Sequence, residues 1–131
     1  GTIVVGAYGD DDAATNAGAV YVYTPNASGG YDETKLTPSD GTEGETISYF
    51  SVNVNNAGVI VAGSAYEDGV GNQSGAVYVY KPDGAGGYSE TKLTASDGAA
   101  NDRFGRYVDI GENGVIAVGA YGDNGENGAV Y

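Results

Sequence analysis

The 131-residue sequence contains no cysteine, histidine, methionine or tryptophan. The absence of cysteine excludes a disulfide framework and thiol chemistry. Because histidine is missing as well, a zinc site is not expected. No base stands beside a serine or threonine in a way that would activate a nucleophile. The sequence therefore predicts a non-enzymatic protein.

Long hydrophobic runs and basic residues are also scarce. Every apolar run ends far short of the roughly 20 residues that a transmembrane helix needs, so no membrane span is predicted. Eighteen acidic residues face only five basic ones, which gives a net charge of −13. Such a charge repels nucleic acid and anionic membrane surfaces, and it favours cations or basic proteins as partners.

The residues that are present favour strands. Glycine accounts for 24 residues and tyrosine for 12, whereas leucine occurs only at Leu36 and Leu93. Valine, isoleucine and tyrosine stand in short runs separated by Gly, Asn and Asp, which is typical of pleated strands joined by tight turns. The composition indicates an all-β protein.

The chain is built from an internal repeat. GAVYVY at 18–23 recurs at 75–80, and ETKLT at 33–37 recurs at 90–94, both after 57 residues. One unit contains four apolar runs separated by turn-rich segments, and each run suits one strand. Several runs are continuously apolar, which predicts strands that are covered on both faces.

Four antiparallel strands in about 57 residues indicate a blade of a β-propeller. A β-solenoid would need shorter coils, and a β-sandwich would not need the repetition. We expect strands 2 to 4 of a first blade in 1–46, a complete blade in 47–102 and strands 1 to 3 of a third in 103–131. These two and a half repeats fall short of the roughly sixteen strands of a closed propeller, so we expect an incomplete ring and a fragment of a longer protein.

The segment 92–131 resembles a known repeat. It reads KLTASDGAANDRFGRYVDIGENGVIAVGAYGDNGENGAVY, which is similar to the FG-GAP repeat of the integrin α-subunit propeller and closer still to its variant in bacterial and algal surface proteins. Phe104 and Gly105 match the first part of the motif, and VGA at 118–120 matches the second. Tyr121 stands where the family usually has proline.

The preceding copy is divergent, because Ile47 and Ser48 replace Phe–Gly and AGSAY at 62–66 replaces VGAP. The resemblance implies an extracellular or cell-surface propeller segment for adhesion, recognition or assembly. Its partners would be other blades of the parent chain, neighbouring copies, or a basic protein or glycan ligand. An alternative is a structural subunit whose open strand edges join copies into a ring or filament.

Acidic residues gather at one end of the predicted blades, where the loops between strands 2 and 3 and between successive blades emerge. This rim either binds Ca²⁺, which prefers oxygen ligands, or steers a basic partner, or is a solvated acidic surface. The candidate Ca²⁺ ligands among them are Asp10, Asp11, Asp12, Asp68 and Asp123. The whole predicted rim comprises these five with Asp40, Glu43, Glu45, Glu67, Asp97, Asp102 and Glu126.

Integrin-type repeats hold calcium elsewhere, in the hairpin between strands 1 and 2, through alternating aspartates. The corresponding stretch here, DIGENG at 109–114, keeps Asp109 and Glu112 but loses that alternation. The resemblance therefore gives these two residues as further candidate ligands, in a pattern that departs from the calcium-binding one.

Two further kinds of site follow from short motifs. Asn26 and Asn72 each begin an N-glycosylation sequon in a predicted loop. Tyr8, Tyr66 and Tyr121 recur after strand 2, near the acidic rim, and are candidate ligand-contacting aromatics. Their recurrence in every copy also suits a structural role.

Overall fold

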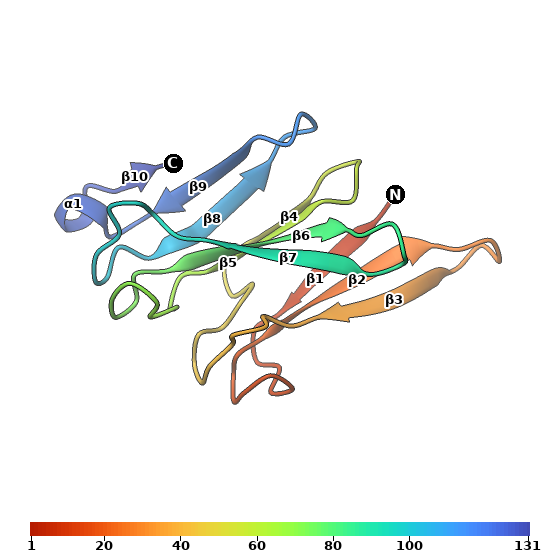
Figure 1. Cartoon of the computed structure of the whole chain (residues 1–131), viewed down its shortest axis with the longest axis horizontal. Coiled ribbons are helices and arrows are strands. Elements are labelled where there is room, and N and C mark those ends of the chain that lie inside the picture. The colour runs from red at the N-terminus through yellow and green to blue at the C-terminus, as the bar shows by residue number, and fades with distance from the viewer.

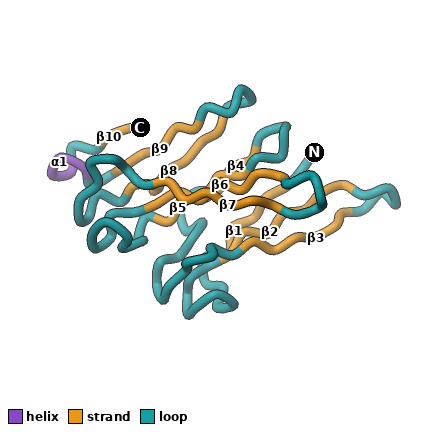
Figure 2. The backbone as a smooth tube through the Cα atoms, in the orientation of Figure 1, coloured by secondary structure: helices purple, strands orange, loops and turns teal.

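The computed structural model describes the backbone of residues 1–131 and every side chain except those of Asn124 and Glu126. Within these residues the chain forms ten strands and one short helix, joined by loops and turns (Figures 1 and 2). In chain order they are β1 (Ile3–Ala7), β2 (Ala19–Pro25), β3 (Tyr31–Leu36), β4 (Val52–Val54), β5 (Ile60–Ser64), β6 (Ala76–Pro82), β7 (Tyr88–Leu93), β8 (Phe104–Ile110), β9 (Ile116–Ala120), α1 (Asp123–Glu126) and β10 (Ala129–Val130).

The strands form three antiparallel sheets, one for each repeat. Their strand orders are β1-β2-β3, β4-β5-β6-β7 and β10-β9-β8. The three sheets follow one another in chain order, with the four-stranded sheet in the middle (Figure 1). The prediction of an all-β fold of antiparallel four-stranded units in an incomplete ring is confirmed.

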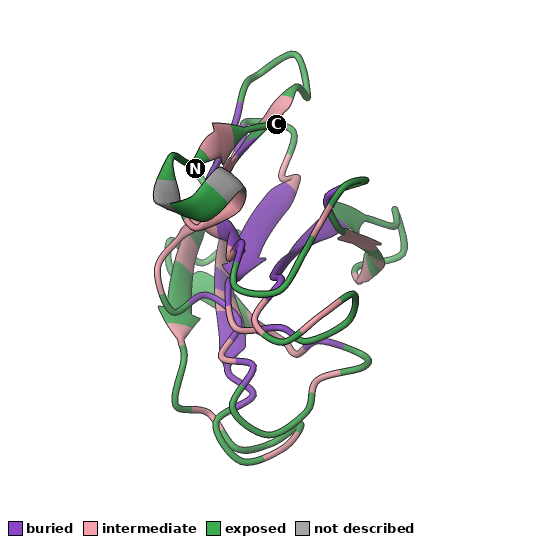
Figure 3. Ribbon diagram, turned by 90° about the vertical axis from the view of Figure 1, so that its left-hand side faces the viewer, coloured by how far each residue is buried: buried purple, intermediate pink, exposed green. Residues whose placement is uncertain are grey.

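The middle sheet is covered on both faces. All five residues of β5 are buried, and alternate side chains of a strand point to opposite faces. Ile60 and Ala62 join a core shared with the first sheet, whereas Val61 joins a core shared with the third. Figure 3 shows this burial along the central strands. The residues of β5 are continuously apolar because the strand is covered on both faces, as the sequence predicts.

The same pattern in β1 has a different outcome. Ile3 and Val5 are 46% and 47% exposed, because none of the described residues forms a sheet over that face of the first repeat. The exposed apolar side chains of β1 form a face suited to a neighbouring sheet. The described residues do not provide such a sheet.

We call the contact between the first and middle sheets the first junction, and the contact between the middle and third sheets the second junction. At each junction, two consecutive residues turn the chain into the next sheet, and we call such a pair a corner. The second-junction corner is Phe104 and Gly105, and the backbone of Gly105 has φ = +89°, at a bulge that interrupts the β8–β9 register. Ser48 occupies the same place at the first junction with φ = +63°. The divergent Ile47–Ser48 pair therefore keeps the backbone of the Phe–Gly pair.

The loops sort to two ends of the sheets. The β1–β2, β5–β6 and β9–β10 connections lie at the same end as the segments between sheets, and the short hairpins lie at the other (Figure 1). The helix α1 is part of the β9–β10 connection and was not predicted. No helix among the described residues is long and apolar enough to span a membrane.

Candidate functional site

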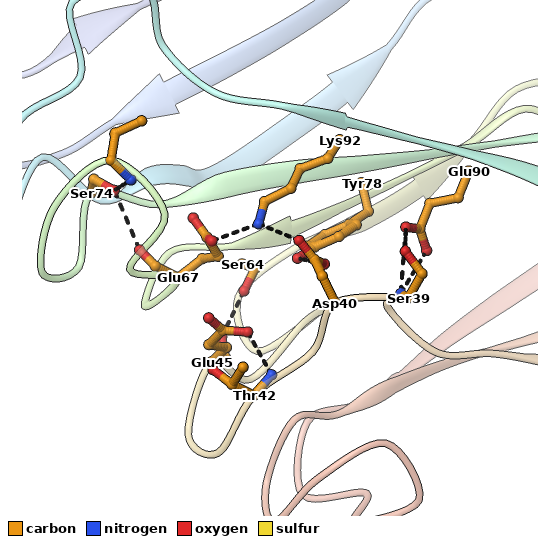
Figure 4. Close-up of polar contacts among 11 residues, drawn as sticks. Ser39, Asp40, Thr42, Glu45, Ser64, Glu67, Ser74, Tyr78, Glu90 and Lys92 are labelled. Atoms are coloured by element: carbon orange, nitrogen blue, oxygen red, sulfur yellow. Dashed lines mark hydrogen bonds and ion pairs between the residues drawn. The ribbon is translucent and has the colours of Figure 1, made fainter.

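A lysine lies between two acidic residues on the rim of the second repeat. Lys92 Nζ contacts Glu67 Oε1 at 2.5 Å and Asp40 Oδ2 at 2.7 Å (Figure 4). The Tyr78 hydroxyl donates to Asp40 at 2.7 Å. Burial acts to lower the pKa of Lys92, but its hydrogen bonds to Asp40 and Glu67 outweigh that effect and raise the pKa. This rim position is therefore a polar network in which one lysine compensates part of the charge of two carboxylates.

The first repeat has a related arrangement, in which both acids come from the β1–β2 loop. Lys35 pairs with Asp10 at 2.6 Å and with Asp12, and the Tyr21 hydroxyl donates to Asp10 at 3.1 Å. The hydrogen bond from Lys35, together with the Asp12 N–H, holds the pKa of Asp10 below its usual 3.8. Two of the predicted Ca²⁺ ligands thus already have a cationic partner. ETKLT recurs after 57 residues, as GAVYVY does. This recurrence could have indicated that Lys35 and Lys92 hold equivalent positions on the rim.

In the third repeat a hydroxyl lies between the corresponding acids. Tyr131 Oη lies 2.7 Å from Asp97 Oδ1 and 2.9 Å from Asp123 Oδ2, and its single proton can be donated to either carboxylate. Hydrogen bonding to Asp97 and Asp123 raises the pKa of Tyr131. Asp123, another predicted Ca²⁺ ligand, therefore shares the Tyr131 hydroxyl with Asp97 of the preceding segment.

The two remaining rim candidates shape their own loops. Asp11 accepts the Asn16 N–H at 2.7 Å, and Asp68 accepts the Gln73 N–H at 2.6 Å. Across the described side chains, no group of three or more Asp, Glu, His or Cys residues is arranged to hold a metal ion. The Glu126 side chain lies outside the described residues. Calcium on the rim stays a prediction, and the structure does not gather its predicted ligands.

The other two candidate ligands, Asp109 and Glu112, join adjacent repeats. Asp109 Oδ1 accepts a hydrogen bond from Asn53 Nδ2 at 2.5 Å. Glu112 Oε2 accepts the Asn56 N–H at 3.0 Å. Each acid therefore binds the strand or hairpin of the repeat before it, at the end of the sheets opposite the rim, which gives these residues a packing role in this chain.

The comparison with family models agrees with this geometry. A model described as the FG-GAP repeat matches residues 1–23, 31–80 and 88–131. The chain belongs to the FG-GAP repeat family. The unmatched positions 24–30 and 81–87 are centred on the β2–β3 and β6–β7 hairpin turns. A search of curated proteins found no matching relative. The chain is thus a propeller-blade segment, of a family whose repeats are usually non-catalytic.

The FG-GAP repeats bring the predicted aromatic residues together. Tyr49 contacts both Tyr8 and Tyr66, with ring centroids 4.7 and 5.8 Å apart. The Arg103 guanidinium lies 5.9 Å from the ring centroids of both Tyr66 and Tyr121. Tyr49 and Arg103 were not predicted as contact residues, because they follow no recurring motif of their own. These residues extend across both junctions.

Tyr66 differs from its two counterparts in register. Ala7, Ser64 and Ala120 hold equivalent strand positions, opposite Ala19, Ala76 and Ala129. Tyr8 and Tyr121 directly follow the first and third of these, whereas Tyr66 comes one residue later. The recurrence of tyrosine after strand 2 is therefore approximate.

The two sequons occupy different settings. Asn26 lies in the β2–β3 hairpin, where its Oδ1 accepts the Ser28 and Gly30 N–H groups and its Nδ2 donates to Asp32. Asn72 has an exposed side chain in the β5–β6 loop, and its carbonyl accepts the Asn101 N–H at 2.8 Å. Asn72 thus offers a free side chain, whereas Asn26 is part of a turn.

Proposed function

We propose that this chain is a non-enzymatic segment of an extracellular or cell-surface β-propeller, in which FG-GAP repeats pack side by side and present an acidic rim for recognition. The observation that carries the proposal is the junction, which occurs twice with the same backbone contacts. The Ile47 N–H donates to the Ala17 carbonyl at 2.8 Å, and the Phe104 N–H donates to the Ser74 carbonyl at 2.9 Å.

Glycines make each junction possible. A Cβ atom on Gly6 would lie 2.8 Å from the Cβ of Ser48, and one on Gly63 would overlap the carbonyl oxygen of Gly105. Only a residue without a side chain fits there, since real Cβ atoms do not approach other heavy atoms so closely. The second junction is thus a contact of backbone with backbone, whereas at the first junction Gly6 also meets the Ser48 side chain.

The third repeat carries the same receiving face. Gly119 is the equivalent of Gly63, and among the described residues only its own repeat's Tyr107 lies near it, with the Tyr107 Cβ 3.7 Å from a Cβ placed there. A cavity of about 450 Å³ opens beside it, lined by Tyr107, Gly119, Ala120, Tyr121, Asn127, Gly128, Ala129 and Val130. This face suits the corner of a further FG-GAP repeat.

The proposal is tested by extending the chain. Tyr131 is the equivalent of Tyr78, so a second copy of residues 79–131 placed after Tyr131 continues the repeat in register. We expect Gly119→Ala to leave the stability of the 131-residue chain unchanged and to destabilise the extended chain, measured by urea unfolding. If Gly119→Ala is neutral in both chains, the third repeat does not receive a further corner.

A second candidate function is the formation of a ring or filament through open edges. It is favoured by β1 and β10, which are edge strands, with Val130 80% exposed. The mass of the chain in solution distinguishes the two. A stable monomer at micromolar concentration would argue against self-assembly, and concentration-dependent growth would support it.

A further inference from the structure

A cavity of about 360 Å³ lies at the first junction, at the end of the sheets opposite the acidic rim. The first repeat contributes Thr2, Thr24 and Thr34 to its lining, and the second contributes Tyr88 and the glycine-rich β6–β7 hairpin. Figure 1 shows the N-terminal end of the chain beside this hairpin. We call this space the hydroxyl cavity. Its volume lies within the range of small-ligand sites, roughly 300 to 1,000 Å³.

The three threonines form a polar patch on an otherwise apolar sheet face. Thr24 follows Val22 by two residues and Thr34 precedes Leu36 by two, and alternate residues of a strand share a face. Val22 is buried in the core of the first junction, and Leu36 packs against that core. Within the described part of the chain, no hydrogen bond engages the three threonine hydroxyls. These hydroxyls are therefore available to a ligand in the cavity.

The full set of hydroxyls is particular to the first junction. The repeat is shifted by 57 residues, so Val59 and Lys81 replace Thr2 and Thr24 at the second junction. Both replacements line the corresponding cavity there, and the third threonine recurs as Thr91. The packing of FG-GAP repeats therefore does not require three threonines at this place, and their clustering at the first junction points to a ligand.

Tyr88 provides the apolar wall of the hydroxyl cavity. Its side chain packs against the first-junction core, and burial raises the pKa of its hydroxyl, so the phenol stays neutral. Gly84 and Gly86, in the same hairpin, have φ = +78° and +97°, and a Cβ atom on either would meet no heavy atom within 4 Å. The hairpin therefore leaves open space beside the tyrosine ring.

The chemistry of the lining selects a class of ligand. None of the described residues that line the cavity is charged, and the net charge of −13 repels an anion. A threonine hydroxyl both donates and accepts hydrogen bonds, as every hydroxyl group of a sugar does. A tyrosine ring offers an apolar face that matches the C–H face of a pyranose. The lining therefore favours a neutral sugar over an ion.

We propose that the hydroxyl cavity binds one hexose unit of a neutral glycan. The pyranose ring lies against Tyr88, and its hydroxyl groups form hydrogen bonds with the three threonines. This site lies at the hairpin end of the sheets, so the inference goes beyond recognition by the acidic rim. It needs only the first junction of this chain and depends neither on calcium nor on the packing of further repeats.

The test titrates the 131-residue chain with the methyl glycosides of glucose, galactose, mannose and N-acetylglucosamine and records backbone amide NMR signals. We expect at least one of these probes to shift the signals of Thr24 and Tyr88 in a saturable way at millimolar concentration. If none of the probes shifts them, or if all shifts are confined to the acidic rim, the proposal is wrong.

Thr34→Val and Thr91→Val form a matched pair of variants, because both threonines hold the same place in ETKLT. Thr34→Val keeps the shape of the side chain and removes one hydroxyl of the cavity, so we expect it to weaken the tightest-binding probe about fivefold. Thr91→Val removes a hydroxyl at the second junction and should retain binding within about twofold. Equal losses in the two variants, or no loss in Thr34→Val, contradict the assignment.

Tyr88→Leu and Tyr31→Leu test the ring in the same way. Tyr31 is the equivalent of Tyr88 in the first repeat, is 51% exposed and does not line the hydroxyl cavity. We expect Tyr88→Leu to weaken the probe about tenfold and Tyr31→Leu to leave its binding unchanged. Thermal melting of each variant separates loss of binding from loss of the fold, and unchanged binding in Tyr88→Leu overturns the proposal.

Discussion

Gly63 lies directly against Gly105, so that a methyl group on the first would overlap the carbonyl oxygen of the second. The contact joins β5 of the second repeat to the corner of the third, and no side chain from either residue intervenes. The name-giving glycines of the FG-GAP motif therefore meet each other across the second junction.

Gly63→Ala should destabilise the chain strongly. Because backbone atoms cannot move aside as a flexible side chain does, we expect a loss of about 3 kcal/mol in the free energy of unfolding, measured by urea denaturation. Gly119→Ala is the matched control, since a Cβ at the same motif position there makes only ordinary van der Waals contact, 3.7 Å from the Tyr107 Cβ. Equal stability of the two variants would show that the junction adapts.

Lys92→Met should be more destabilising than Lys35→Met. Lys92 neutralises Glu67, whose side chain is 3% exposed, and removing one partner of a buried pair costs about 3 kcal/mol. Lys35 pairs with Asp12, which is 74% exposed, and with Asp10, which is 14% exposed, so its partners are less buried than Glu67 and its removal should cost less. Thermal melting of both variants at neutral pH provides the measurement, and equal losses would contradict the difference in burial.

Acid should weaken the fold partly through Asp40. Burial acts to raise the pKa of Asp40, but hydrogen bonds from Lys92 and Tyr78 outweigh it and hold the pKa below 3.8. A carboxylate with a lowered folded pKa stabilises the fold above its unfolded pKa, and that contribution is lost as pH falls through the folded value. We therefore expect the stability of the wild type to fall below about pH 4.

Asp40→Asn serves as the control for that pH series. Protonation of the other acids also relieves repulsion among the 18 acidic residues, which acts in the opposite direction in both proteins. The difference in melting temperature between wild type and Asp40→Asn should be largest near neutral pH and should shrink toward pH 2. A difference that does not change with pH would show that Asp40 acts through packing alone.

Calcium binding on the rim should depend on Lys35. This side chain pairs with both Asp10 and Asp12, and its removal leaves three consecutive acids, with Asp11 between them, without a cationic partner. We expect millimolar Ca²⁺ to raise the melting temperature of Lys35→Ala more than that of the wild type, because a ligand of the native state stabilises it. No shift in either protein, relative to chelator, would end the calcium hypothesis for this loop.

Strand positions could be predicted from the sequence because periodicity and turns are local properties. The repeated run GAVYVY at 75–80 overlaps β6, and ETKLT at 90–94 overlaps β7. The partners of the rim acids could not be predicted in the same way. Lys92 reaches Asp40 across 52 residues, and only the antiparallel register of β6 and β7 places it there.

The aromatic residues near the rim were half predicted for a similar reason. Tyr8 and Tyr121 follow strand 2 in the motif, so the sequence indicates them directly. Tyr49 lies after the divergent corner, and its contact with Tyr8 exists only because the first junction brings two repeats together. Contacts between repeats depend on packing geometry, which a single repeat does not encode.

The backbone contact between Gly63 and Gly105 also bears on the size of the complete propeller. No side chain lies at this point of closest approach, so the two peptide groups themselves set the spacing of the second and third sheets there. The angle between blades decides how many of them close a circle. In a propeller built from such repeats, the contact between Gly63 and Gly105 would therefore help to set how tightly the ring curves.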